Sequence, residues 1–179
     1  NAMIFKPSEL TPATALELAK VFMEAGAPAG LFNVVQGNGR VGAMLVDHPR
    51  IAKVSLTGSV STGKKILSGA ANQLKKVTLE LGGKSPNVIF ADADLDGAVE
   101  WAMIGIFFNQ GEVCSAGSRI IIEESIHDEF VARLKKKAEA MTIGNPVNNP
   151  DIGPVITEKD MEKVLSYIKS GIEEGATLV

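Results

Sequence analysis

Hydrophobic positions along this chain alternate between short runs and longer stretches with helical spacing. Short apolar runs, each bounded by glycine, proline or polar residues, predict strands at residues 4–6, 31–35, 54–56 and 76–81. Between them, amphipathic stretches predict helices at residues 12–25, 39–47 and 61–71. Strands and helices that alternate through short turns imply right-handed crossovers. This part of the chain is therefore expected to form an α/β unit, a parallel sheet with helices on its faces.

The same alternation restarts after Gly82-Gly83, where we place the boundary between two α/β units. Strands are expected at residues 87–90 and 119–123, and a helix is expected from Asp94 to about Asn109. Ten of the fourteen residues from Leu95 to Phe108 are apolar, so that helix is expected to be buried on most sides.

Two later helices are expected to begin at capping-box sequences, Ser125–Asp128 and Thr157–Asp160. The apolar residues of the first are Phe130, Leu134, Ala138 and Met141, and those of the second are Met161, Val164, Leu165, Ile168 and Ile172. Each set recurs at helical spacing, which predicts one apolar face per helix.

Both ends of the chain are interpreted as cut. Asn1-Ala2-Met3 resembles a cloning remnant before a start codon, because no cationic region and apolar core of a signal peptide follow it. Residues 176–179 follow the helix-ending Gly175 and are expected to open a strand. The sequence is therefore expected to be a fragment of a longer protein.

Charge and composition exclude several classes of partner. The 21 acidic residues outnumber the 18 basic ones, and the basic residues offer no stripe that could neutralise a phosphate backbone. Nucleic acid is therefore not expected as a partner. The longest apolar run, Trp101–Phe108, is about eight residues, whereas a membrane span needs about 20. The single cysteine, Cys114, excludes an internal disulfide framework and fits a reducing, cytoplasmic location. His48 and His127 cannot form a metal site by themselves, so no metal is expected.

One glycine-rich turn, Gly37-Asn-Gly39-Arg-Val-Gly42, matches the dinucleotide pattern G-x-G-x-x-G between a predicted strand and a predicted helix. That pattern needs a carboxylate about 20 residues later to hold the ribose, and residues 56–61 contain none. A tight turn without a ligand is an equally good interpretation, because glycine is common in such turns.

A second turn, Gly58–Lys64, nearly matches the phosphate loop G-x-x-x-x-G-K-[ST]. Lys65 stands where a hydroxyl must ligate Mg²⁺, so nucleotide hydrolysis is disfavoured. Small residues and free backbone N–H groups at a helix N-terminus nevertheless predict an anion site that suits a pyrophosphate.

The segment Lys6-Pro-Ser8-Glu9 follows a predicted strand, where ligands of open α/β sheets gather. Glu9 can accept hydrogen bonds from both ribose hydroxyls, and Lys6 can donate one to the same sugar. A surface Lys and Glu without a ligand is the alternative, and charge alone favours it.

Two residues could carry nucleophilic chemistry. Cys114 follows the apolar helix, but a free thiol titrates near ~8.5 and needs a partner to act as a nucleophile. Its alternative is a small buried hydrophobe. Glu80 is the only acidic residue in an otherwise largely apolar strand and precedes two glycines, so it could act as a general base, and partial burial at the strand end is expected. Its alternative is a charge at the strand edge that points into water.

Four motifs together resemble the NAD(P)-dependent aldehyde dehydrogenase superfamily. They are Lys6-Pro-Ser-Glu9, Leu56-Thr-Gly-Ser59 with Gly63, Leu79-Glu-Leu-Gly-Gly-Lys-Ser-Pro86 and Phe108-Asn-Gln-Gly-Glu-Val-Cys114. They occur in the order and approximate spacing of that family, and the resemblance runs from about Ile4 to Val179. The last two motifs are highly specific.

The resemblance implies a role for each motif residue. Cys114 would be the nucleophile and Glu80 the general base. The cofactor would be held by Lys6, Ser8 and Glu9 at the adenine ribose, Gly37 or Gly39 at the adenosine, Gly58, Ser59 and Gly63 at the pyrophosphate, and the Leu81-Gly82 backbone near the nicotinamide. Residues 1–82 would be the C-terminal part of a Rossmann-like NAD-binding domain, and residues 83–179 the N-terminal part of a catalytic domain.

The implied reaction is oxidation of an aldehyde to a carboxylic acid through a cysteine thiohemiacetal and thioester. Glu9 favours NAD over NADP, because a 2′-phosphate beside a carboxylate would be repelled. The family also implies a homo-oligomer for the full-length protein. The segment Gly105–Cys114 resembles betaine and aminoaldehyde dehydrogenases, and semialdehydes and simple aliphatic aldehydes are the alternative substrates.

Three family elements have no counterpart in this chain: an upstream Trp-Asn motif, a downstream Glu-x-Phe-Gly-Pro segment and the oligomerisation strands. The isolated chain is therefore expected to turn over weakly or not at all. The alternative function is a noncatalytic remnant that folds, self-associates or binds nucleotide weakly.

Overall fold

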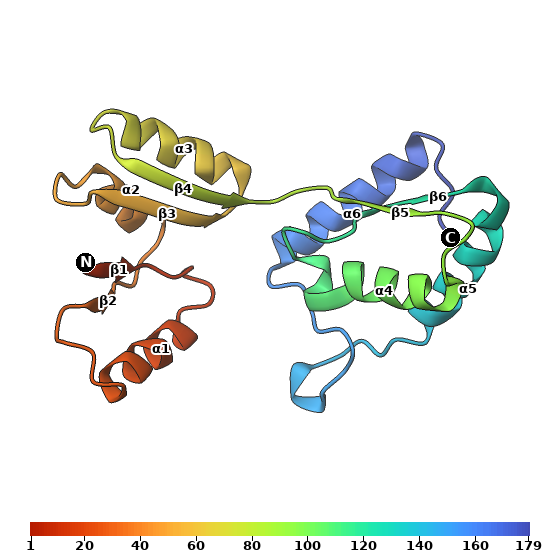
Figure 1. Ribbon diagram of the computed structural model, residues 1–179, viewed down its shortest axis with the longest axis horizontal. Helices are drawn as coiled ribbons and strands as arrows, with labels where there is room; N and C mark the ends of the chain where they lie inside the picture. Colours follow the sequence, from red (N-terminus) through yellow and green to blue (C-terminus); the bar gives the residue numbers. More distant parts are fainter. The chain divides into compact units, whose positions relative to one another are not determined.

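The computed structural model describes residues 1–179 as a mixed α/β chain (Figure 1). It divides into two compact units, Asn1–Leu81 and Gly82–Val179. No helix is long and apolar enough to cross a membrane.

The first unit opens with a parallel strand pair joined by a helix. Strand β1 (Met3–Phe5) pairs with β2 (Phe32–Val34), and α1 (Ala13–Glu24) connects them. Phe22 of α1 stacks on Phe32 of β2 with ring centroids 4.3 Å apart, so the helix is anchored on its own strand pair by aromatic contact.

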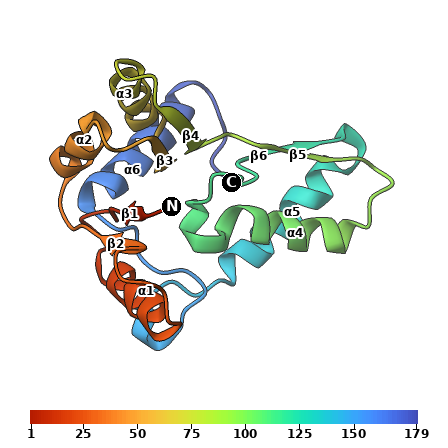
Figure 2. The same cartoon turned by 60° about the vertical axis from the view of Figure 1, so that its left-hand side comes forward.

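The second half of this unit repeats the arrangement. Strand β3 (Lys53–Gly58) pairs in parallel with β4 (Lys76–Leu81) over six residue pairs, and α3 (Val60–Ala71) connects them. Figure 1 and Figure 2 both show α3 lying along this strand pair. Helix α2 (Gly39–Asp47) packs against α3, and the Lys75 ammonium secures the end of α2 by donating to the carbonyls of Val46 and His48.

The second unit is built on a third parallel pair, β5 (Pro86–Ile89) with β6 (Arg119–Ile122), joined through α4 (Leu95–Phe107). Helices α5 (His127–Glu139) and α6 (Glu158–Glu173) follow, with 3₁₀ turns at Phe108–Gly111, Glu124–Ile126 and Pro146–Asn148. The buried core of this unit consists of Ile89, Val99, Ala102 and Phe130.

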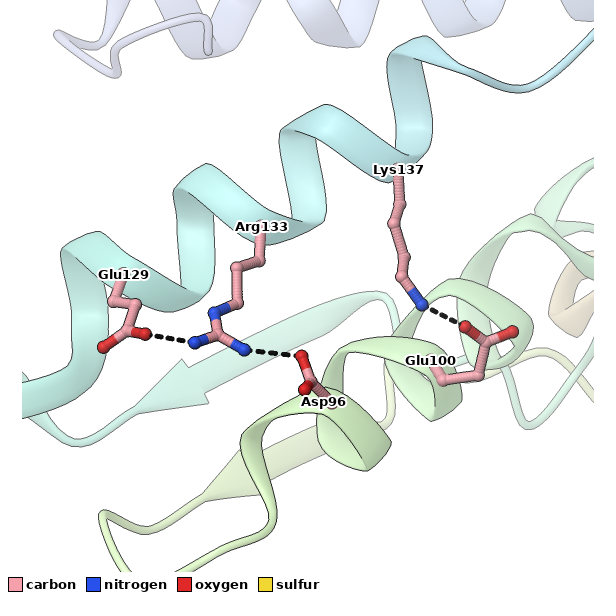
Figure 3. A network of polar contacts seen from close by, with 5 residues as sticks. All are labelled: Asp96, Glu100, Glu129, Arg133 and Lys137. Carbon is pink, nitrogen blue, oxygen red and sulfur yellow. Dashed lines mark hydrogen bonds and ion pairs between the residues drawn. The ribbon is translucent and has the colours of Figure 1, made fainter.

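Helices α4 and α5 are also joined by exposed ion pairs (Figure 3). Arg133 of α5 bonds both Glu129 of its own helix and Asp96 of α4, while Lys137 bonds Glu100 of α4. Figure 3 shows the two cationic side chains reaching from α5 toward α4, at successive turns of the helix. These ion pairs lie outside the apolar core and link the exposed surfaces of α4 and α5.

Parallel strands with helical crossovers were predicted and are confirmed, but the strands form three separate pairs and no continuous sheet. Strands β2 and β3 do not pair, so α2 and its flanking turns connect two independent ladders. The terminal strand expected at residues 176–179 is absent, because no other strand of the chain pairs with it.

The expected burial of the apolar helix on most sides is wrong. In α4 only Val99 and Ala102 are buried, whereas Trp101 is 70% exposed, as is Phe108 just beyond the helix. One face of α4 packs on core residues of β5, β6 and α5, whereas Trp101 and Ile104 stay exposed. Apolar composition therefore overestimated burial.

The two capping predictions had opposite outcomes. Thr157 caps α6 as expected, since its Oγ1 accepts from the Asp160 N–H at 3.1 Å. Ser125 does not cap α5, because a 3₁₀ turn already begins at Glu124 and the Ser125 hydroxyl donates to Glu123.

Candidate active site and cofactor site

Cys114 lies on an exposed loop that leaves the end of α4 through a sharp reversal. Asn109, Gln110 and Gly111 all adopt left-handed backbone conformations, with φ of 49°, 57° and 76°. Such a conformation costs a non-glycine residue about 1–2 kcal/mol, so the loop is held by its surroundings. At Gly111 only glycine fits, because an added Cβ atom would lie 2.9 Å from the Ile106 carbonyl oxygen.

A shallow apolar hollow of about 200 Å³ flanks Cys114. Its lining residues are Ile104, Gly105, Phe108, Val113, Ser115 and Ala116. Two of these, Val113 and Ser115, are the immediate neighbours of Cys114 in sequence. The thiol itself is exposed, and the hollow is lined by the residues on either side of it in sequence. In this chain Cys114 is exposed and is not part of the buried core.

The segment Gly83–Ser85 lies against the Cys114 loop. An added Cβ atom on Gly83 would be 3.1 Å from the Cys114 carbonyl oxygen. Arg119 holds the same segment by two hydrogen bonds. Its Nε donates to the Lys84 carbonyl at 3.0 Å, and its backbone N–H donates to the Ser85 carbonyl. The Cys114 backbone N–H donates no hydrogen bond within the chain, so it is free to serve an oxyanion.

Glu80 occupies the penultimate position of β4, opposite Thr57 of β3. Its side chain is exposed, so the partial burial expected at this strand end is wrong for this chain. The reason is the two-stranded ladder: β4 pairs with β3 alone, and no element of the first unit covers the strand end.

Lys6 and the Gly37 turn form one polar cradle. The Lys6 ammonium donates to the carbonyl oxygens of Pro7 at 2.7 Å and Gly37 at 2.8 Å, and the Glu9 carboxylate lies 4.0 Å away. The sequence presented these two motifs as separate candidates. They meet because β1 and β2 are parallel neighbours, and both motifs follow the carboxyl ends of those strands.

The glycines of this turn are not equivalent. Gly37 has φ of 144°, and an added Cβ atom there would lie 2.4 Å from Val41 Cγ2. Gly42 faces the Lys6 side chain, with Lys6 Cε 3.5 Å from an added Cβ atom. Gly39 begins α2 and has open space around it. Only Gly37 is therefore required by backbone conformation.

The N-terminus of α3 gathers three hydroxyl groups. Ser59 caps the helix by accepting from the Thr62 N–H at 3.1 Å, and its Oγ lies 2.9 Å from the hydroxyl oxygens of Ser61 and Thr62. Gly63 is buried, and an added Cβ atom would lie 2.9 Å from Leu81 Cδ2. A small residue there allows α3 to lie close to β4.

These groups have the chemistry that a dinucleotide needs. The ammonium and carboxylate of Lys6 and Glu9 offer one donor and one acceptor to a ribose diol, and the helix N-terminus after Gly58 offers N–H and hydroxyl donors to a phosphate. Ser8 is exposed beside them and its Oγ accepts from the Leu10 N–H. The residues therefore fit NAD, whose adenosine and pyrophosphate carry those groups.

Gly83, which stands at the predicted boundary and within the family motif, and Arg119 were not predicted as site residues. A doubled glycine before a strand is a signal for a close approach of two backbone segments, and it could have identified Gly83. No sequence signal identifies Arg119, because its acceptor Lys84 lies 35 positions away.

Parallel strands crossed by helices, a helix N-terminus rich in hydroxyls and an exposed cysteine define this chain as part of a parallel α/β protein with a candidate thiol nucleophile. The sequence pattern of the aldehyde dehydrogenase family matches residues 1–179. The chain therefore belongs to the aldehyde dehydrogenase family.

Named relatives are similar over the whole chain. The chain is 55% identical to a betaine aldehyde dehydrogenase of Rhizobium johnstonii and 54% identical to one of Vibrio vulnificus; both alignments cover 100% of the chain and 37% of the relative. A solved NAD-dependent aldehyde dehydrogenase from Sinorhizobium meliloti matches 99% of the chain with TM-score 0.97 and 43% identity. The chain spans 36% of that structure, so it corresponds to little more than a third of these proteins.

Proposed function

We propose that this chain carries the nucleophile and part of the cofactor site of an NAD-dependent enzyme that oxidises aldehydes to carboxylic acids. The observation that carries the proposal is the exposed Cys114 thiol, whose sequence neighbours Val113 and Ser115 line an apolar hollow, in a chain that belongs to the aldehyde dehydrogenase family. This favours the enzyme over the noncatalytic remnant and over a phosphate-loop NTPase.

Cys114 and Glu80 supply the covalent chemistry in this proposal. The Cys114 thiolate attacks the aldehyde carbon, and the free Cys114 N–H donates to the oxyanion of the resulting thiohemiacetal. Collapse of the thiohemiacetal to the thioester expels a hydride from the former aldehyde carbon, and NAD held at the site would be its acceptor. Glu80 then removes a proton from the water that attacks the Cys114 thioester, which releases the carboxylic acid and regenerates the thiol.

The residues that would hold NAD lie mainly in the first unit. Lys6, Ser8 and Glu9 would contact the adenine ribose, Gly37 or Gly39 would line the adenosine pocket, and Gly58, Ser59 and Gly63 would contact the pyrophosphate; Leu81 and Gly82 would pass near the nicotinamide. In support, a solved betaine aldehyde dehydrogenase from Staphylococcus aureus, 40% identical over 99% of the chain, is a complex with NAD⁺ (TM-score 0.93, 36% of that structure covered).

NAD is the preferred cofactor in this proposal, with NADP second. The Glu9 carboxylate would repel a 2′-phosphate and leave its charge without a partner. In the full-length enzyme, kcat/KM should be much higher with NAD than with NADP. Comparable values would contradict the assignment of Glu9.

The complete enzyme is proposed to act on betaine aldehyde or a related aminoaldehyde, as the names of the relatives suggest. Residues 1–82 would belong to its NAD-binding domain and residues 83–179 to its catalytic domain. We further propose a cytoplasmic location, since the free Cys114 fits a reducing compartment. The full-length protein is proposed to be a homo-oligomer, as the family resemblance implies. Turnover by the 179-residue chain should be weak or absent, because loss of one oxyanion donor alone costs ~10²-fold or more in kcat.

Thiol labelling tests the proposal directly, because Cys114 is the only cysteine. The rate of iodoacetamide modification should exceed that of an unstructured thiol, should change when NAD is added and should respond to Glu80→Gln. A Cys114→Ser variant should remain unlabelled. Labelling at the rate of an unstructured thiol, insensitive to both NAD and Glu80→Gln, would favour the noncatalytic remnant.

A further inference from the structure

The Lys6 ammonium donates hydrogen bonds to two backbone carbonyls, and its third N–H remains available to donate to a ligand. Its bonds to Pro7 and Gly37 occupy two of its three donors. Only 18% of the Lys6 side chain is exposed, so water does not compete freely for these bonds. The Glu9 carboxylate, at 4.0 Å, is close enough for charge attraction but beyond hydrogen-bond distance.

The two carbonyls differ in how their position is fixed. Pro7 is adjacent to Lys6 in sequence, and its bond spans a single peptide unit. Gly37 is 31 positions away, so it alone ties Lys6 to a different segment of the unit. The direction of the Gly37 carbonyl depends on a φ of 144°, which L residues rarely adopt, and on the space that Val41 leaves only for a hydrogen atom.

We propose that Gly37 is a positioning residue: its backbone carbonyl holds Lys6 so that the remaining ammonium N–H and the Glu9 carboxylate face the two hydroxyls of one ribose. This inference rests on the proposed NAD site and adds a role that Gly37 exerts through Lys6. The left-handed glycine sets the sugar selectivity of the site because it fixes where the ammonium points.

The test is calorimetric titration of the chain with ADP and with 2′-deoxy-ADP, which lacks one hydroxyl. The wild type should bind ADP about tenfold more tightly, as expected for hydrogen bonds to charged groups. Gly37→Ala should lose most of that ratio. Gly30→Ala is the matched control, because Gly30 also has positive φ (80°), precedes the same strand β2 and contacts neither Lys6 nor Glu9.

A double-mutant cycle with Lys6→Met separates positioning from general damage. Gly37→Ala should weaken ADP binding in the presence of Lys6 and change it little in Lys6→Met. Equal losses in both backgrounds, or an equal loss of the ratio in Gly30→Ala, would overturn the inference while leaving the nucleotide site in place. If the folded wild type binds neither nucleotide, the proposed cofactor site itself fails, and the inference fails with it.

Discussion

Gly83 lies directly against the backbone carbonyl of Cys114, where an added Cβ atom would be 3.1 Å from the carbonyl oxygen. The chain segment that follows Glu80 therefore packs on the loop that carries the thiol. Both segments belong to the second unit, and Arg119 holds them together through the Lys84 carbonyl. An added methyl group at position 83 would require the Cys114 carbonyl to shift by a few tenths of an ångström, so glycine allows this close approach.

Gly83→Ala should consequently displace the Cys114 loop. We expect a loss of about 1–3 kcal/mol in the free energy of unfolding, the usual cost of an added methyl group in a close contact. The measurement is urea denaturation followed by circular dichroism, with the rate of Cys114 alkylation as a second readout. Gly82→Ala is the matched comparison, since no atom lies within 4 Å of its added Cβ. Equal stability of the two variants would show that the loop moves aside freely.

Phe130 should be the most costly side chain to truncate in the second unit. It is 0% exposed and packs with Ile89, Val99 and Ala102. Phe130→Ala should cost about 3–5 kcal/mol, through lost burial and the cavity left behind. Phe90→Ala removes the same atoms from a side chain that is 64% exposed and should cost far less in the same denaturation experiment. Similar losses would mean that the core is centred elsewhere.

Asp151 should give the second unit a specific dependence on pH. Hydrogen bonds from the Thr142 backbone N–H and hydroxyl lower the pKa of the Asp151 carboxyl below its ordinary value. Because the folded-state pKa is the lower one, its stabilisation is present above the unfolded pKa of about 4 and is lost as pH falls through the folded pKa.

The experiment compares the free energy of unfolding of the wild type and Asp151→Asn between about pH 2 and 7, across the ordinary pKa of an aspartate. The two curves should differ most at neutral pH and converge in acid. Thr142→Val retains the backbone donor and removes the hydroxyl, so its curve should lie between them. A difference that does not change with pH would contradict an electrostatic role for Asp151.

The ion pairs of Figure 3 should contribute a small, salt-sensitive stabilisation. All five side chains are substantially exposed, where screening keeps such pairs weak. Arg133→Met should lower the thermal midpoint slightly more than Lys137→Met, because Arg133 bonds two carboxylates and Lys137 one. The deficits should shrink in high salt. Deficits that persist in high salt would assign the effect to lost packing of the side-chain stems.

Local features of the fold were predictable where one nearby interaction decides them and no other local structure competes. Thr157 caps α6 because its hydroxyl needs only the Asp160 N–H three residues ahead. The Ser125 prediction failed for an equally local reason, since a competing 3₁₀ turn placed that serine inside a turn. Burial of α4 was not predictable in the same way: Trp101 and Val99 are both apolar, and only the position of β5, β6 and α5 decides which of them is covered.

By itself, the sequence determined the alternation of strands and helices, the parallel crossovers and the motif residues that carry the family resemblance. Those properties depend on side-chain type and on spacing within one helix or strand. The tertiary structure alone decided that Lys6 bonds Gly37 and that Gly83 touches the Cys114 carbonyl. Each contact joins residues 31 positions apart. Whether two such residues lie in contact depends on strand pairing and on the conformation of the connecting turns, and neither follows from a local sequence pattern.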